Sequence, residues 1–134
     1  MNPYPHFYLQ ATLDYENKIV FETISCSFLK NKDINLKFLF GVNNSKLFAW
    51  LLYKFVYNNA IRSTRYDEQY ASKIPCPDFS RINQKPIINI VEKLLNAKEE
   101  NPEADTNQLE KQLDEMVYKL YELTEEEIKI VEGK

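Results

Sequence analysis

Two stretches near the start of the chain have the hydrophobic pattern of β-strands. Tyr4–Leu13 is rich in β-prone residues, and Lys18–Phe28 shows a partial alternation through Ile19 and Phe21. The four residues between them, 14–17, are polar and typical of a turn. The pattern therefore predicts an N-terminal β-hairpin, the beginning of a small sheet.

Helical spacing replaces this alternation further along the chain. A short helix is predicted over Ile34–Phe40, with Asp33 as its N-cap and Gly41 as its end. After Ser45, another natural N-cap, the run Lys46–Tyr57 is apolar on most faces. Such a helix belongs at the centre of a domain. We expect only three of its side chains to face solvent: Lys46, Tyr53 and Lys54.

The second half of the chain predicts two amphipathic helices. The first spans Gln84–Lys98, with Pro86 in its first turn, where proline is tolerated. A polar break follows, and either Asp105 or Thr106 caps the second helix. Each helix carries one apolar stripe. Two such helices with a short link should pack antiparallel.

The last element has the most specific local pattern. Thr124 and Glu127 have the spacing of a capping box, and Leu123 and Ile128 occupy the positions of a hydrophobic staple. These four residues predict a terminal helix over Glu125–Glu132, with Gly133 just past its end.

Together these elements predict a single α+β domain spanning 1–134. We expect the β-hairpin or small sheet to pack on the buried central helix, followed by the antiparallel helical hairpin and the short C-terminal helix. Residues 1–83 would form a mixed α/β part, and residues 84–134 a helical part. A chain of 134 residues fits one domain and can bury a core without disulfides or metals.

The composition argues against an independent enzyme. Gly41 and Gly133 are the only glycines, which leaves no Gly-rich phosphate loop. His6 is the only histidine, so no nucleophile–base set can be drawn. Cys26 and Cys76 lie far apart without metal-ligand spacing and are predicted to be reduced thiols. We expect no catalytic, cofactor-binding or metal-ligating residue in this chain.

Membrane insertion and secretion are also not predicted. No apolar run is long enough to cross a membrane. The first ten residues lack the basic and small-residue features of a signal peptide. The sequence therefore predicts a cytoplasmic bacterial protein.

Charge is divided unevenly along the chain. Residues 1–98 hold 13 Lys/Arg and 8 Asp/Glu, a net charge of +5, whereas residues 99–134 hold 4 and 12, a net charge of −8. An acidic whole, with a pI of about 5.3, disfavours a free-standing protein that binds DNA tightly. It is compatible with a module whose acidic tail faces away from DNA and whose partner domain supplies most phosphate contacts.

Four stretches, in order, resemble the C-terminal part of the TaqI-like specificity domains of type II and type IIG restriction-modification methyltransferases. They are KFLFGVNNSKLF (37–48), IPCP (74–77), IINIVEKLL (87–95) and LEKQLDEMVYKLYELTEEEIKIVEG (109–133). Each is weak alone, but their order over roughly 36–133 is specific. Phe40–Asn43 replaces a leucine-rich run of the family, and Cys76 replaces its usual Ile.

This resemblance implies a division of labour with a second domain. In the family, an upstream domain binds S-adenosylmethionine and methylates adenine N6, and the parent protein can also carry an endonuclease. The C-terminal domain holds double-stranded DNA and reads the target sequence. The cofactor loop and the Asn-Pro-Pro-aromatic motif of the upstream domain are missing here. The chain is therefore expected to be a C-terminal fragment that positions DNA and does not itself bind the cofactor.

Base and phosphate recognition needs amides, hydroxyls and cations, and these are densest in Asn58–Lys73. A solvated surface loop is an equally good interpretation of that stretch. If it does contact DNA, we expect the contacts to come from Lys54, Asn58, Asn59, Arg62, Ser63, Thr64, Arg65, Tyr66, Gln69 and Lys73.

An alternative function remains open. The helical hairpin Gln84–Glu122 could instead dock to another subunit, which would make the chain a protein–protein assembly module of a restriction-modification complex. The apolar stripes of the two helices fit either function.

Overall fold

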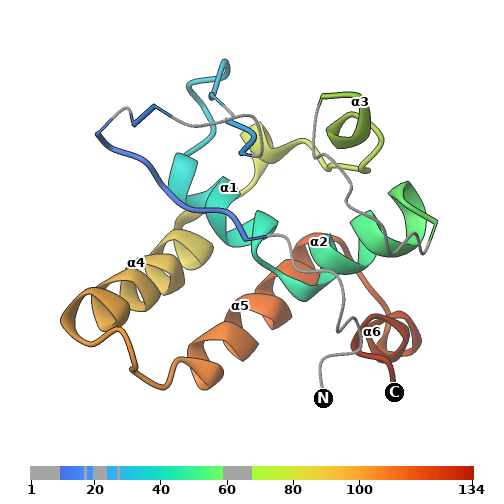
Figure 1. Cartoon of the computed structure of the whole chain (residues 1–134). Coiled ribbons are helices and arrows are strands. Elements are labelled where there is room, and N and C mark those ends of the chain that lie inside the picture. Colours follow the sequence, from blue (N-terminus) through green and yellow to red (C-terminus); the bar gives the residue numbers. More distant parts are fainter. Residues whose placement is uncertain (1–9, 17, 20–23, 27, 59–67) are drawn as a thin grey trace.

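A computed structural model describes residues 10–16, 18–19, 24–26, 28–58 and 68–134 of the chain (Figure 1). Within these residues the secondary structure is helical throughout. The elements, in order, are α1 (Leu36–Asn43), α2 (Lys46–Trp50), the π-helix η1 (Leu51–Val56), α3 (Glu68–Ala71), the 3-10 helix η2 (Phe79–Arg81), α4 (Lys85–Glu100), α5 (Asn107–Leu120) and α6 (Glu125–Glu132).

The predicted α+β class is therefore wrong, because the described residues of the N-terminal hairpin form no strand. The rest of that hairpin lies outside the described residues. Apolar side chains that would have lined a sheet are in solvent instead: Ile19 is 93% exposed and Phe28 is 83% exposed. Strand propensity reflects packing on a half-buried surface. With no core beneath these residues, their alternation stabilises nothing.

A side chain takes the place of a strand partner for the described segment 10–16. The Asn44 amide, at the end of α1, accepts a hydrogen bond from the Ala11 N–H at 3.1 Å and donates one to the Ala11 carbonyl at 3.3 Å. One residue thus receives the pair of backbone bonds that a β-ladder would have provided. This contact ties the N-terminal segment to the helical core without a sheet.

The antiparallel helical hairpin, taken by itself, is confirmed. Helices α4 and α5 lie side by side (Figure 1) and contact each other extensively. Thr106 is the N-cap residue of α5, but its hydroxyl bonds the Glu110 carboxylate. The Asp105 carboxylate accepts the Asn107 N–H at 3.0 Å, so both predicted capping residues stabilise this helix start.

The terminal helix α6 is also confirmed, together with its capping box. The Thr124 hydroxyl accepts the Glu127 N–H at 3.3 Å, and the Glu127 carboxylate accepts the Thr124 N–H at 2.8 Å. Gly133 ends the helix with φ = 70°, a left-handed conformation that glycine adopts without strain. Leu123 and Ile128, the predicted staple pair, are half-buried against the core.

The predicted central helix divides into α2 and the π-helix η1. Ser45 caps α2 as expected, and Leu47 and Phe48 are buried. From Leu51 the hydrogen bonds lengthen to the i→i+5 pattern, as in the 2.8 Å bond from the Tyr57 N–H to the Leu52 carbonyl. This change rotates the buried face, and Phe55 is 65% exposed, contrary to prediction.

Helix α1 also differs from prediction, because Gly41 does not end it. The helix is capped by Asn35 and continues to Asn43, which leaves Gly41 buried inside it. A Cβ at position 41 would lie 2.8 Å from a Val91 methyl carbon and 2.9 Å from an Ile87 methyl carbon. The glycine therefore lets α1 approach α4 closely.

The core joins the predicted mixed and helical parts. Its fully buried side chains come from α1, η1, α4 and α5: Phe38, Val42, Leu52, Val91 and Val117. A buried carboxylate adds a polar link, because Asp114 of α5 accepts the Lys46 N–H at the start of α2 at 2.8 Å. The Lys46 ammonium lies 3.4 Å from the same carboxylate. As far as the chain is described, none of its helices is long and apolar enough to cross a bilayer.

Candidate nucleic-acid interface

The structure describes four of the ten residues predicted to contact DNA. Lys54 lies on η1, Asn58 follows it, Gln69 lies on α3 and Lys73 follows α3, and all four are exposed. The other six lie outside the described residues: Asn59, Arg62, Ser63, Thr64, Arg65 and Tyr66. The described members therefore flank the predicted contact segment on both sides.

Two buried residues anchor these flanks. Tyr57, just after η1, and Ile74, just after α3, are each 7% exposed and belong to the core. Between the anchors, the described polar side chains point to solvent. The chain thus leaves the core at Tyr57 and returns to it at Ile74, and it presents amides and cations on the outside.

The end of η1 has unusual backbone geometry. π-helical turns are rare and occur often at functional sites. Asn58 ends the turn with φ = 47°, a left-handed conformation that asparagine tolerates better than most residues. The Lys54 ammonium lies 5.3 Å from the centre of the Tyr53 ring, within the range of a cation–π contact. Together with exposed Phe55, this end offers a cation and aromatic surface close together.

Sequence analysis missed the aromatic part of this surface. Phe55 was expected in the core because an α-helix continued from Lys46 would have pointed it inward. The only hint in the sequence is the Asn58–Asn59 pair, which suits a left-handed turn. Nothing in the local pattern marks the change from α2 to a π-helix at Leu51.

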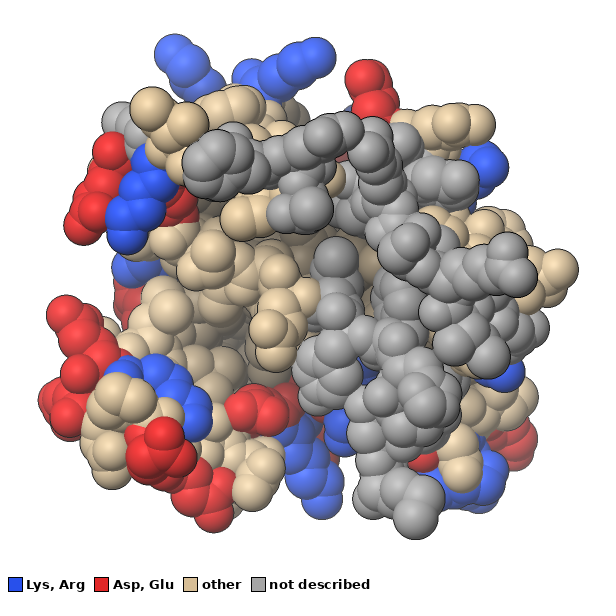
Figure 2. All heavy atoms as spheres, viewed as in Figure 1, with Lys and Arg blue, Asp and Glu red and all other residues tan. Residues whose placement is uncertain are grey.

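The candidate surface lies far from the most acidic part of the molecule. In Figure 1, η1 and α3 are at the upper right, and the α4–α5 link is at the lower left. Figure 2 shows acidic side chains gathered at that lower left end. They belong to the end of α4, the link and the start of α5, where Glu99, Glu100, Glu103, Asp105 and Glu110 follow one another. Repulsion of a polyanion is therefore concentrated away from η1 and α3.

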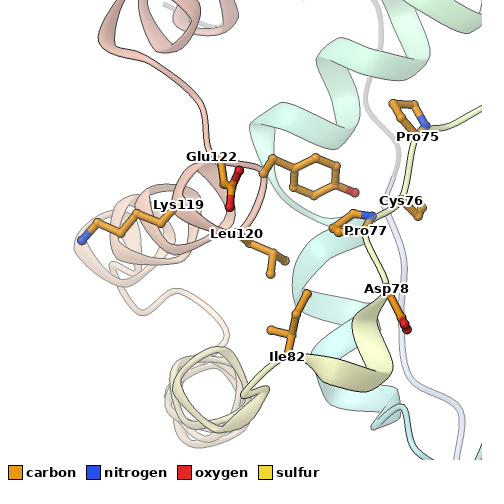
Figure 3. Close-up of a pocket in the computed structure, with 9 residues that line it drawn as sticks. Pro75, Cys76, Pro77, Asp78, Ile82, Lys119, Leu120 and Glu122 are labelled. Carbon is orange, nitrogen blue, oxygen red and sulfur yellow. The ribbon is translucent and has the colours of Figure 1, made fainter.

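An open cleft of about 710 Å³ is the largest hollow among the described residues (Figure 3). Pro75, Cys76 and Pro77 form one wall, and the end of α5, from Lys119 to Glu122, faces them. Cys76 is exposed as a residue, yet partial burial of its thiol raises its pKa, and the neighbouring Tyr121 hydroxyl partly opposes this shift. A thiol with a raised pKa is protonated at neutral pH and a poor nucleophile.

Burial likewise raises the pKa of Tyr121, and the adjacent Cys76 raises it further. Both groups therefore stay neutral at physiological pH. Over the part of the chain that the structure describes, no three His, Cys, Asp or Glu side chains come together as a metal site. The cleft has an apolar floor and neutral polar groups, which suit packing against a ligand better than chemistry on one.

No protein-family model matches this chain, and no solved structure matches its fold.

Proposed function

We propose that this chain is the DNA target-recognition module of a restriction-modification methyltransferase. In this proposal it holds double-stranded DNA for adenine-N6 methylation by a separate domain, which binds S-adenosylmethionine. The module itself contributes contacts and no catalytic group. The parent protein may be divided between genes or may be a single longer chain, and both arrangements use the same surface.

The observation that supports the proposal most is the exposure of all four described contact residues. Lys54 and Lys73 supply cations for phosphates, and Asn58 and Gln69 supply amides that can pair with base edges. The anchors Tyr57 and Ile74 hold both flanks of the segment on the core. A rigid base carrying an outward polar segment is a common arrangement for recognition.

The resemblance of the closing stretch adds support of a different kind. Leu109–Gly133 forms the second hairpin helix, the capping box and α6. Its distinctive pattern has a structural cause, because each of its capping residues satisfies a backbone group. The stretch therefore indicates the family and is not itself assigned to DNA contact.

The alternative of a helical assembly module receives less support. A docking hairpin would be expected to expose large apolar side chains. The large apolar side chains of α4 and α5 are buried or half-buried, and none of them is among the exposed large hydrophobics of the described residues. The stripes on both helices are taken up by the core.

A binding titration with charge-matched variants tests the proposal. The full chain is titrated into a fluorescently labelled duplex of 20–30 base pairs at several salt concentrations. The Lys54→Ala/Lys73→Ala variant is compared with Lys111→Ala/Lys129→Ala, whose exposed lysines lie on α5 and α6. Each phosphate contact contributes about 0.9 to the slope of log K against log salt. We expect the first pair to weaken binding and to reduce the slope by about 1–2.

The control pair should leave the slope nearly unchanged. Equal effects of the two pairs would mean that the lysines act only through net charge, and η1 and α3 would then not be the interface. The methyltransferase part of the proposal has its own test. The gene next to this one, or the reading frame upstream, should encode an adenine methyltransferase without its own C-terminal recognition part.

A further inference from the structure

A second surface, distinct from η1 and α3, is assembled by the side chain of Gln84. Its amide nitrogen donates to the Asp33 carbonyl at 2.8 Å and to the Phe79 carbonyl at 3.1 Å. Its amide oxygen accepts the Asn35 N–H at 2.8 Å. One residue thus holds together the connector before α1, the helix η2 and the start of α4, which are far apart in sequence.

Basic side chains gather where these three segments meet. Stretches 28–37 and 78–85 together contain five Lys/Arg and two Asp/Glu. Four of the cations are exposed. We refer to these four as the basic end: Lys30, Lys32, Arg81 and Lys85. The fifth, Lys37, lies 2.7 Å from Glu92 of α4 and is occupied by that ion pair.

The two acids of these stretches offset the basic end only in part. Asp78 accepts hydrogen bonds from the backbone and the hydroxyl of Ser80, at the start of η2. The same carboxylate lies 3.0 Å from Arg81, yet the Arg81 side chain remains 87% exposed. No ion pair is formed by Lys30, Lys32 or Lys85 within the described residues. The basic end therefore keeps a local excess of positive charge.

The acidic tail is too distant to neutralise this excess. Helix α4 begins at Lys85 in the basic end and finishes at Glu100 beside the acidic link. Sixteen helical residues span about 24 Å, more than twice the Debye length of about 8–10 Å at physiological ionic strength. Figure 2 shows the same separation, with basic side chains projecting from the upper edge above the connector and acidic ones at the lower left.

We propose that the basic end is a second contact surface for DNA, which binds the phosphate backbone of the duplex without reading its sequence. The inference rests on the proposed function for the identity of the partner, but it concerns different residues. Lysines on a connector and at a helix start provide point charges, which suit phosphates and carry little base information. A protein partner would instead require a buried apolar centre to its interface, and these four side chains provide none.

The location supports simultaneous contact by both surfaces. In Figure 1 the connector and η2 lie in the upper half of the molecule, as do η1 and α3, and the acidic link lies below. A duplex along this upper side would meet cations from both surfaces. The basic end would thus provide affinity, and the segment between Tyr57 and Ile74 would provide the sequence-dependent contacts.

The test compares two triple variants of the full chain that have the same net charge. Lys30→Ala/Lys32→Ala/Lys85→Ala removes three cations of the basic end and leaves the Arg81–Asp78 pair in place. Lys93→Ala/Lys111→Ala/Lys129→Ala removes three exposed lysines elsewhere. Both are titrated against two labelled duplexes of unrelated sequence, over a range of salt, after circular dichroism has shown unchanged helix content and melting temperature.

We expect the basic-end variant to lose roughly tenfold or more in affinity at about 0.1 M salt, equally on both duplexes, and its salt slope to fall by about 2–3. The control variant should bind nearly as the unmodified chain does. Equal binding by the two triple variants would overturn the inference. So would a loss confined to one of the two duplex sequences, because that would indicate base contact.

The same titration separates this inference from the proposed function. If Lys54→Ala/Lys73→Ala weakens binding and the basic-end variant does not, the basic end is refuted and the recognition surface stands. The reverse result supports the basic end and removes η1 and α3 from the interface. If the unmodified chain binds anionic lipid vesicles and no duplex, both the inference and the proposed function are wrong.

Discussion

Gly41→Ala offers a direct test of how α1 packs on the helical hairpin. In an ordinary helix interior this substitution stabilises, because alanine has the better helix propensity by about 0.8–1.0 kcal/mol. Here Gly41 is buried, and the new Cβ would lie 2.8 Å from Val91 Cγ2, 2.9 Å from Ile87 Cγ2 and 3.2 Å from Leu113 Cδ1. Carbon atoms pack favourably at about 3.5–4.0 Å. The helices must therefore separate, or the neighbours must move.

Those neighbours have little freedom to move. Val91 and Ile87 are β-branched residues within α4 and are 0% and 4% exposed, and β-branched side chains in helices are nearly confined to one rotamer. Adding a methyl group to a well-packed core costs about 1–3 kcal/mol. Subtracting the propensity gain leaves a net destabilisation on the order of 1 kcal/mol.

Urea denaturation followed by circular dichroism measures this difference. The midpoint should fall with the m-value unchanged, because the same surface is exposed on unfolding. A double-mutant cycle with Val91→Ala provides the control, since removing the Val91 methyl groups makes room for the new Cβ. We expect a favourable coupling between the two substitutions. A stabilised Gly41→Ala variant, or zero coupling, would refute the close approach of α1 to α4.

Three further substitutions follow from the contacts. Asp114→Ala should cost about 1–3 kcal/mol in urea denaturation, because it removes the acceptor of the Lys46 N–H; Asp114→Asn, which keeps that acceptor, should cost less. Burial raises the pKa of Asp114, so its ionisation opposes folding as the pH rises through that pKa, and the Asn variant should lose this dependence. Glu122 ends α5 with φ = 56°, so Glu122→Gly should raise the free energy of unfolding by up to about 1 kcal/mol; a loss would contradict the left-handed cap. Hydrogen bonds from Thr124 lower the pKa of Glu127, so its contribution is present above pH 4.5 and lost as the pH falls through the lowered value. An acid titration should show earlier loss of helix content in the parent than in Glu127→Gln, and identical curves would exclude this carboxylate as the cause.

Elements determined by neighbouring residues could be predicted from the sequence. The capping box of Thr124 and Glu127 depends only on residues three positions apart, and the helix forms where the pattern places it. The amphipathic stripes of α4 and α5 likewise predicted two helices with a short link. In both cases the physical cause lies within one or two helical turns.

Elements that depend on distant partners could not be predicted. Gly41 is a good helix terminator by local rules, but its role comes from Val91 and Ile87, some fifty residues away. The alternation around Ile19 and Phe21 predicted a strand, because local propensity cannot show whether a core lies beneath it. Local pattern and tertiary packing gave different answers there, and the packing decided.

The candidate site shows the same division. Composition located the polar segment that η1 and α3 flank, because amides and cations are visible in the sequence. The exposure of Phe55 could not be predicted, since it follows from a change of helix type at Leu51. The basic end could not be predicted either, because the Gln84 side chain joins segments about fifty residues apart.

The salt dependence of duplex binding by the full chain, with and without Arg62→Ala/Arg65→Ala, tests the central claim most directly. Both arginines belong to the predicted contact segment. We expect the unmodified chain to bind with a Kd of roughly 10⁻⁴–10⁻⁶ M near physiological salt, as a module without its partner domain. The double variant should bind more weakly, with a slope reduced by about 1–2. Unchanged affinity and an unchanged slope would contradict the assignment of this segment to DNA.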